Sequence, residues 1–332
     1  SVVGEGNDNS LKQFKKLLNF KVKKIKPSTE FNGWIIPKPY NLKNAKIFNI
    51  KDKCVYDGKK TPFGVILGTS DFKGKIDLKT LKSKIYTHSE NKSYIPFHCV
   101  NQYRPGKKDW GFCMSSIDKK KFNEKYYKIL IEKQSIYSSM KILDYKIRGK
   151  SNKTIVIYAH NCHPYQANDN MSGCAVGISL IKYLEKRKNF FSYNLLISPE
   201  IYGPLFWLKE KKKIKNIIGA IKLGALGSTG SLKLQKSFES DSFIDKYAEI
   251  IFKNKKLDIK NFRDIWGNDE TVFEAPGYEI PSITVTRYPF KHYHSNKDNL
   301  KNINKSKIKN SYSFIKNLIL NYENNFKKVS DC

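Results

Sequence analysis

With 332 residues, 39% of them hydrophobic and 13% aromatic, the chain can bury the core of a large domain, which excludes general disorder. No stretch approaches the roughly 20 consecutive apolar residues of a membrane-spanning helix, and the first residues show no secretory signal, so we expect a cytoplasmic protein without membrane contacts. The net charge of +32 suggests nucleic-acid binding.

The composition of the basic residues argues against that partner. Only five of the 62 are arginine, the residue favoured for bidentate phosphate and base contacts, and the lysines are scattered among Asn and Ile. We therefore expect no specific nucleic-acid binding. The six cysteines form no closely spaced pair, which indicates free thiols in a reducing compartment.

The first part of the chain divides into two textures. Residues 9–25 carry apolar side chains at helical spacing, which predicts a helix. Residues 31–126 contain short apolar runs separated by Asp-Gly, Pro and Gly turns, which is typical of a small β-rich unit. We predict that this unit is inserted into a catalytic domain formed by residues 1–30 and 127–332.

Beyond residue 127, apolar runs of strand length alternate with helical segments. This alternation predicts a three-layer α/β core with a mostly parallel sheet. The predicted strands are 153–159, 192–198, 216–223 and 281–287, and the predicted helices are 172–186, 204–211, 241–253 and 303–322.

Ionisable residues gather where three of these strands end. They are His160, His163 and Asp169 after the first strand, Glu200 after the second, and His292, His294 and Asp298 after the fourth. In open α/β sheets, ligands bind beyond the carboxyl ends of the strands. Imidazole and carboxylate are ligands that zinc prefers, and a spare carboxylate can serve as a base.

A histidine at a strand end is usually a hydrogen-bonded structural residue, and that interpretation has to be weighed here. Four of the six histidines fall in the two strand-end clusters, so clustering alone leaves a metal site and structural roles both open. The other two, His88 and His98, lie in the β-rich unit, and we interpret them as structural.

Several motifs in order resemble zinc aminopeptidases that include bacterial leucyl aminopeptidase and glutaminyl cyclase. The closer resemblance is to an aminopeptidase-like family often found beside polysaccharide-biosynthesis genes. Its segments SITG-x-G, W-x-(V/I)-P-x-x-(W/Y)-N, WGFC, CHP-x-x-AN-(D/N), GSDE and YH(T/S) are matched by Ser1–Gly6, Trp34–Asn41, Trp110–Cys113, Cys162–Asp169, Gly267–Glu270 and Tyr293–Ser295.

The resemblance implies that His163, Asp169 and His294 ligate zinc and that Glu200 is the general base that takes a proton from water. His160 is expected to orient a ligand. Asp269 and Asp298 are candidates for the same role, and capping a helix start is an equally ordinary role for an Asp. Candidates for lining a pocket, with packing or solubility as the alternative, are Tyr103, Arg104, Trp110 and Arg287. Cys162 fits a buried, inert thiol better than a nucleophile or a ligand.

Two departures from the two-zinc relatives bear on the number of ions. Those relatives carry Glu-Glu where this chain has Glu200-Ile201, and an Asp in the segment that contains Gly224 here. We therefore expect one zinc ion per chain, with Glu200 as base or as fourth ligand. If a second ion binds, Glu270 or His160 would be the first substitutes to consider.

The sequence as a whole predicts a cytoplasmic metallo-aminopeptidase-like hydrolase that acts on a small peptide or amide. Two alternatives stay open. One is an amidase or acyl-transfer enzyme acting on a glycan precursor, and the other is a metal-binding or scaffold protein with a degenerate site. The oligomeric state does not follow from the sequence.

Overall fold

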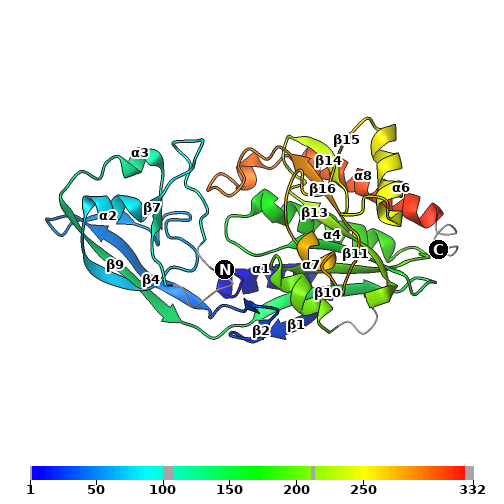
Figure 1. The fold of residues 1–332 in the computed structure, drawn as a ribbon, viewed down its shortest axis with the longest axis horizontal. Helices are drawn as coiled ribbons and strands as arrows, with labels where there is room; N and C mark the ends of the chain where they lie inside the picture. Colours follow the sequence, from blue (N-terminus) through cyan, green and yellow to red (C-terminus); the bar gives the residue numbers. More distant parts are fainter. Residues whose placement is uncertain (1, 100–107, 211–213, 326–332) are drawn as a thin grey trace.

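The computed structural model describes residues 2–99, 108–210 and 214–325. A large mixed sheet flanked by helices occupies the right of Figure 1, and a small β-rich part occupies the left. The large sheet has eight strands in the order β1-β10-β12-β11-β13-β16-β14-β15. Their bounds are β1 Lys21–Ile25, β10 Met140–Ile147, β11 Thr154–His160, β12 Ser192–Ser198, β13 Ile217–Gly224, β14 Ser231–Gln235, β15 Asp258–Lys260 and β16 Ser282–Tyr288.

The four central strands of this sheet, β12, β11, β13 and β16, are parallel neighbours. Strand β10 joins one side antiparallel to β12, and β14 joins the other side antiparallel to β16. Because the central strands are parallel, their carboxyl ends meet at one edge of the sheet, where the predicted site residues follow them.

The central strands are apolar on both faces because each face supports a separate core. Every residue of β11 is buried, and its side chains alternate between the two faces. Ile155 and Ile157 belong to one apolar core, while Val156 and Tyr158 belong to the other. This double burial explains the continuous apolar run that predicted a covered strand.

Helices close both cores, which gives the three layers. One core includes side chains of α1, α4, α6 and α8, and the other includes side chains of α5 and α7. The α/β expectation is confirmed. The helices of this part are α1 Glu5–Leu17, η1 Ala167–Ser172, α4 Gly173–Leu184, α5 Tyr202–Leu208, η2 Ile214–Asn216, α6 Phe243–Asn254, α7 Glu270–Phe273, η3 Leu300–Asn302 and α8 Lys305–Asn324.

The small part is built on an antiparallel sheet in the order β5-β4-β9-β6, with its own apolar core. Its elements are β4 Tyr40–Phe48, β5 Cys54–Asp57, β6 Phe72–Asp77, α2 Leu78–Ser83, β7 Ile85–Tyr86, β8 Phe112–Cys113, α3 Ser116–Lys119 and β9 Tyr126–Ser135, and the pair β2 Glu30–Phe31 and β3 Trp34–Ile35 precedes them. The unit of residues 31–126 stays a prediction. Strand β9 pairs within this sheet and begins at residue 126, the last residue of the predicted unit.

The helix predicted for residues 9–25 is wrong in its second half. Helix α1 ends at Leu17, Leu18 is extended, and residues 21–25 form the edge strand β1. The apolar spacing Leu11, Phe14, Leu18 continues at helical intervals through Val22 and Ile25, so periodicity alone could not mark the break. Antiparallel pairing of β1 with β10 decides the local structure instead.

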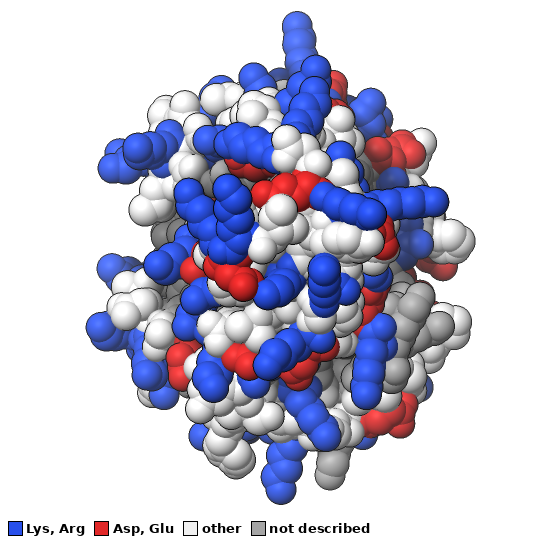
Figure 2. All heavy atoms as spheres, turned by 90° about the vertical axis from the view of Figure 1, so that its left-hand side faces the viewer, with Lys and Arg blue, Asp and Glu red and all other residues white. Residues whose placement is uncertain are grey.

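The face of the molecule on the side of the small β-rich part is basic without a single concentrated stripe. Figure 2, which faces the small β-rich part, shows lysine and arginine side chains spread across the whole view and mixed with acidic ones. Among the residues that the structure describes, no helix combines the length and apolar character needed to cross a membrane. The absence of specific nucleic-acid binding stays a prediction.

Candidate metal centre

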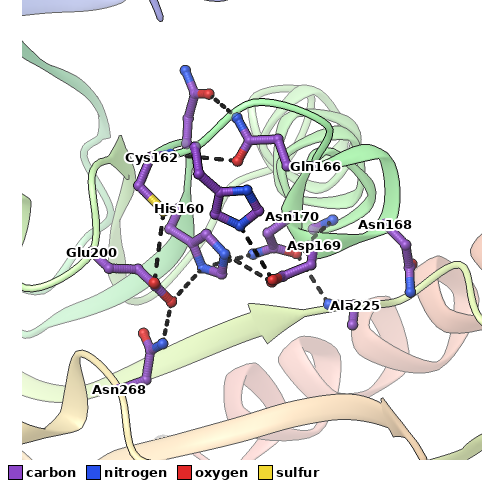
Figure 3. A network of polar contacts seen from close by, with 12 residues as sticks. His160, Cys162, Gln166, Asn168, Asp169, Asn170, Glu200, Ala225 and Asn268 are labelled. Atoms are coloured by element: carbon purple, nitrogen blue, oxygen red, sulfur yellow. Dashed lines mark hydrogen bonds and ion pairs between the residues drawn. The ribbon is translucent and has the colours of Figure 1, made fainter. Parts of the chain in front are cut away.

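The site lies beyond the carboxyl ends of the central strands. Strand β11 ends at His160, and the following loop and η1 carry His163 and Asp169 (Figure 3). Strand β12 ends two residues before Glu200, and the segment after β16 carries His294. Four predicted side chains from three strand ends therefore meet at one edge of the sheet, together with His160.

Three of these side chains form a compact group of potential ligands. The Asp169 Oδ2 atom lies 3.4 Å from His163 Nε2 and 3.5 Å from His294 Nε2. One ligand atom from each of the three lies within 4.8 Å of the others. Ligand atoms about 2.0–2.1 Å from a tetrahedral zinc ion lie about 3.3 Å apart, so these separations fit a bound ion better than good hydrogen bonds.

The His163 ring is fixed in the orientation that a ligand needs. Its Nδ1 atom lies 2.8 Å from the Pro164 carbonyl oxygen, which leaves Nε2 directed toward Asp169. Phe97 stacks on the ring with a centroid distance of 4.7 Å. Burial favours the neutral ring, but the hydrogen bond and charge of Asp169 outweigh it and raise the pKa of His163 above its ordinary value.

His294 lies on the open side of the group. Its side chain is 35% exposed, whereas those of His163 and Asp169 are almost fully buried. The ring stacks on Tyr293 at a centroid distance of 3.8 Å and meets Phe97 edge to face. Burial lowers the pKa of His294 to about 4, so the ring is neutral at neutral pH, as a metal ligand must be.

Asp169 is held by its side chain and by its backbone. Its Oδ1 atom lies 2.9 Å from His160 Nε2, which leaves Oδ2 for the two other histidines. The carboxylate of Asp298 accepts the backbone N–H groups of Asn168 and Asp169 at 2.7 and 2.9 Å. Burial would raise the pKa of Asp169, but the charges and hydrogen bonds of His160 and His163 hold it well below its usual range.

Asn170 ties the ligand loop to the neighbouring strand. Its side-chain oxygen accepts the N–H groups of Gly173 and Ala225, and its Nδ2 donates to the Leu223 carbonyl at 2.6 Å (Figure 3). Position 173 requires glycine because a Cβ there would lie 2.3 Å from the Leu223 oxygen. These contacts explain why Asn and Gly follow the candidate ligand Asp169.

The two oxygens of Glu200 have different surroundings. Oε1 faces three nitrogen groups: His160 Nδ1 at 3.1 Å, Lys222 Nζ at 3.3 Å, and the Asn268 amide. Oε2 has the Cys162 thiol at 3.7 Å (Figure 3). Burial would raise the pKa of Glu200, but the charges of His160 and Lys222 outweigh it and lower the pKa to about 2.

The backbone next to Glu200 is held by Asp269. Ile201 has a φ of 59°, an unfavourable left-handed conformation for a β-branched residue. Its N–H donates to Asp269 Oδ1 at 2.5 Å. Burial raises the pKa of Asp269 to about 6. The adjacent Gly203 allows the turn to pack tightly, because a Cβ there would lie 1.8 Å from Ser198 Oγ.

Comparison with known proteins identifies the family of the chain. A family model described as "Domain of unknown function (DUF4910)" matches residues 1–325. The chain belongs to this family. A Clostridium acetobutylicum protein described as a "Putative polysaccharide biosynthesis protein with aminopeptidase-like domain" is 30% identical over 333 residues, which covers 98% of this chain and 75% of the relative.

Solved structures extend the relationship of the DUF4910 chain to the aminopeptidase-like fold. A C. acetobutylicum crystal structure described as a "putative peptidase" matches with a TM-score of 0.87 and 29% identity, covering 98% of this chain and 77% of that one. BSAP, a zinc aminopeptidase from Bacillus subtilis, matches with a TM-score of 0.67 and 12% identity, covering 96% and 88%. The second likeness shows the fold alone. The resemblance to aminopeptidase-like proteins found in the sequence is confirmed.

The other candidates of the DUF4910 chain lie in less direct positions. Glu270 is buried, and its carboxylate lies 3.1 Å from the Arg263 guanidinium. Among the described residues, two groups of side chains could hold a metal ion, and Glu270 belongs to neither. The groups are His163, Asp169 and His294, and His160, Cys162 and His163. His292 contacts the Tyr94 hydroxyl at 3.1 Å instead of joining the group. Two other histidines make local contacts: His88 accepts backbone N–H groups, and His98 stacks on Tyr86.

The suggested pocket residues do not line the metal centre where the structure describes them. Trp110 stacks on Phe72 in the core of the β-rich part. The Arg287 guanidinium is buried against Ser311, Asn310 and the Gly230 carbonyl. Tyr103 and Arg104 lie outside the described residues.

Sequence reasoning missed three side chains that shape this site in the DUF4910 chain. Lys222, on β13, and Asn268 contact Glu200, and Phe97, from the β-rich part, stacks on His163. A lysine inside a continuous apolar strand was an available signal, because such a strand is buried on both faces. Asn268 lies inside the segment Gly267–Glu270 that carries the resemblance, but the sequence-based candidates in that segment are only its neighbours Asp269 and Glu270. Nothing local in the sequence distinguishes Phe97.

Proposed function

We propose that this DUF4910 protein is a zinc-dependent hydrolase of the aminopeptidase type that cleaves an amide or peptide bond. The observation that carries the proposal is the group formed by His163, Asp169 and His294. Two imidazoles and one carboxylate are a ligand set of catalytic zinc sites, which keep a further position open. One ion per chain would be held by these three side chains, of which His294 is the most exposed.

The donor set fits this metal for reasons found in the chain itself. His163 and His294 both direct Nε2 toward Asp169 Oδ2, and Asp169 Oδ1 is occupied by His160. A zinc ion bound there would supply Lewis acidity toward the scissile carbonyl and lower the pKa of water. His160 and Asp298 would orient Asp169 from two sides, as partners of ligands commonly do.

Glu200 is the side chain that we assign to moving the proton. Its low pKa keeps it ionised at neutral pH, so it enters the reaction as a carboxylate. Oε1 contacts His160, Lys222 and Asn268, whereas Oε2 meets the weakly donating Cys162 thiol at 3.7 Å, so Oε2 is the oxygen that would accept a proton from water and return it to the leaving amine.

A cavity beside His163 is the candidate site for the substrate. It has a volume of about 420 Å³ and is lined by the start of α1, by Tyr40 and Asn41, and by the loop around Cys162 and His163. Residues 3–6 and 40–41 belong to two of the segments that carry the sequence resemblance. Their convergence on one cavity supports a role in binding a small peptide or amide.

The name of the C. acetobutylicum relative favours a second class of substrate, an amide of a glycan precursor, handled by the same group of side chains.

The reaction would take place in the cytoplasm. The cysteines in the described part of the chain, Cys54, Cys99, Cys113, Cys162 and Cys174, are all free, which is typical of a reducing compartment.

The test is a Glu200→Gln substitution, which keeps the size of the side chain and removes the base. Zinc content per chain should persist, while release of amine from amino-acid anilides, dipeptides and N-acetylated sugars should fall by roughly 10²–10⁴-fold. Loss of zinc together with activity would instead make Glu200 a ligand. A parent protein that binds zinc but turns over none of these amides would favour a scaffold.

Glu249→Gln is a closely matched control. Glu249 Oε2 lies 3.3 Å from Lys236, the same separation as between Glu200 and Lys222, and the two carboxylates are 27% and 26% exposed. Because Glu249 lies on α6, outside the site, its substitution should leave both zinc content and turnover unchanged. Equal loss of activity in the two variants would refute the assignment of Glu200.

A further inference from the structure

Lys222 is a buried cation inside the candidate site. Its side chain is 1% exposed and projects from the central strand β13, where a lysine is costly unless it is paired. Its Nζ atom lies 3.3 Å from Glu200 Oε1 and 5.9 Å from the centre of the Trp266 ring. In the proposed hydrolysis Lys222 only holds Glu200 Oε1, and a neutral donor could do the same, so the buried positive charge itself suggests a further role.

A second group of potential metal ligands lies next to the same glutamate. His160, Cys162 and His163 each offer a ligand atom within 4.8 Å of the others. Glu200 touches two of them, with Oε1 3.1 Å from His160 Nδ1 and Oε2 3.7 Å from Cys162 Sγ. A carboxylate, an imidazole and a thiol in contact could hold a second divalent ion beside the first.

The surroundings of this second group oppose such an ion. The positive charge of Lys222 lies beside the Glu200 carboxylate that the second ion would need. Two positive charges held close together in a buried site repel each other strongly, because little water screens them. Carboxylates from the neighbouring strand ends are also missing. Ile201 packs against the apolar core, and at Gly224 a Cβ would lie 2.7 Å from Trp266 Cζ3, so a longer ligand side chain has no room there.

We propose that Lys222 acts as a fixed cation that keeps the second ligand group free of metal and so holds the centre at one ion. This inference rests on the proposed zinc centre. Lys222 neutralises Glu200 without taking up a coordination position, and it contacts Oε1 and leaves Oε2 to the Cys162 thiol. Lys222 is a positioning residue for Glu200. Its ammonium group supplies the positive charge that a second ion would otherwise supply beside this carboxylate.

The experiment counts the ions bound per chain. Parent, Lys222→Met and Lys222→Arg proteins are stripped with chelator and titrated with zinc by calorimetry, and metal content is measured after gel filtration. We expect one ion in the parent and in Lys222→Arg, which keeps the charge. Lys222→Met should bind two, and removal of the charge should tighten the first ion by roughly tenfold.

Two further variants show where the additional ion binds. Lys222→Met combined with Glu200→Gln should return to one ion, because the second site loses its carboxylate. Lys236→Met removes a lysine paired with a glutamate at the same 3.3 Å distance outside the site and should keep one ion. With cobalt in place of zinc, only Lys222→Met should show the near-ultraviolet thiolate-to-cobalt band of a Cys162 ligand.

The outcomes separate this inference from the proposed function. One ion in both the parent and a folded Lys222→Met protein overturns the role of Lys222 and leaves the zinc centre standing. No ion in the parent overturns the zinc centre, and the inference falls with it. If Lys222→Met does not fold, the parent decides, since a second ion or a thiolate band at excess cobalt in the parent overturns the inference.

Discussion

Asp298 offers a sharp test of how the ligand loop is held. Its two oxygens accept the N–H groups of Asn168 and Asp169 at 2.7 and 2.9 Å, and the residue is 2% exposed. Asp298→Asn keeps the shape but turns an amide donor toward one of these N–H groups. Loss of one hydrogen bond to a charged acceptor, with a buried donor left unpaired, should destabilise the fold by about 2–3 kcal/mol.

The same change should weaken zinc binding because Asp298 positions the backbone of the candidate ligand Asp169. Loss of a residue that orients a ligand typically reduces metal affinity by about 10–100-fold. Competition with a chromophoric chelator gives the affinity, and urea unfolding of the metal-free protein gives the stability. The control is Asp77→Asn, which affects the N-cap of α2, where Asp77 accepts the Thr80 N–H at 2.8 Å. Asp77→Asn should leave zinc affinity unchanged, and an unchanged affinity in Asp298→Asn would refute the reasoning.

Two other glutamates give predictions away from the metal centre. Burial raises the pKa of Glu274 from 4.5 to about 7, so the folded state holds the proton more tightly than the unfolded chain. The stability from this group is therefore present below pH 4.5 and lost as pH rises through 7. Allowing for its partial exposure, urea unfolding should show that Glu274→Gln removes about 1–2 kcal/mol of this pH dependence, and parallel pH curves would contradict it. Glu323 accepts the N–H groups of Phe190 and Phe191 and the Tyr193 hydroxyl, so Glu323→Gln should lower the free energy of unfolding by about 2–3 kcal/mol, whereas a loss under 0.5 kcal/mol would show that these contacts are readily replaced.

The central sheet was predictable because its strands carry a strong local signal. The strand predicted at 192–198 has the bounds of β12, and those predicted at 216–223 and 281–287 differ from β13 and β16 by one residue at each end. Such runs are apolar on both faces, which few other structures require. The sheet extends further, through β1, β10, β14 and β15. These outer strands are only partly buried, so their sequences resemble helices or turns and pairing partners decide their structure.

The candidate site was predictable only as far as its motifs reach. His163, Asp169, Glu200 and His294 follow strand ends, and parallel topology brings strand ends together whatever the loops between them do. Lys222 could have been noticed, since a charge in a doubly buried strand needs a partner. That this partner is Glu200 depends on how the end of β12 packs against the turn around Asn268. Such long-range packing cannot be read from the local sequence.

The β-rich part contacts the candidate metal centre through the segment that carries His294. The Phe97 N–H donates to the His294 carbonyl at 2.7 Å, and Asn296 N–H donates to the Ile95 carbonyl at 2.9 Å. His294 has a φ of 50°, a left-handed conformation that costs energy in a non-glycine residue and persists only where the surroundings fix it. Residues 95–97 supply that fixation and also place the Phe97 ring on His163. The geometry of the candidate ligands therefore depends on the β-rich part, although all three candidate ligands follow strands of the large sheet.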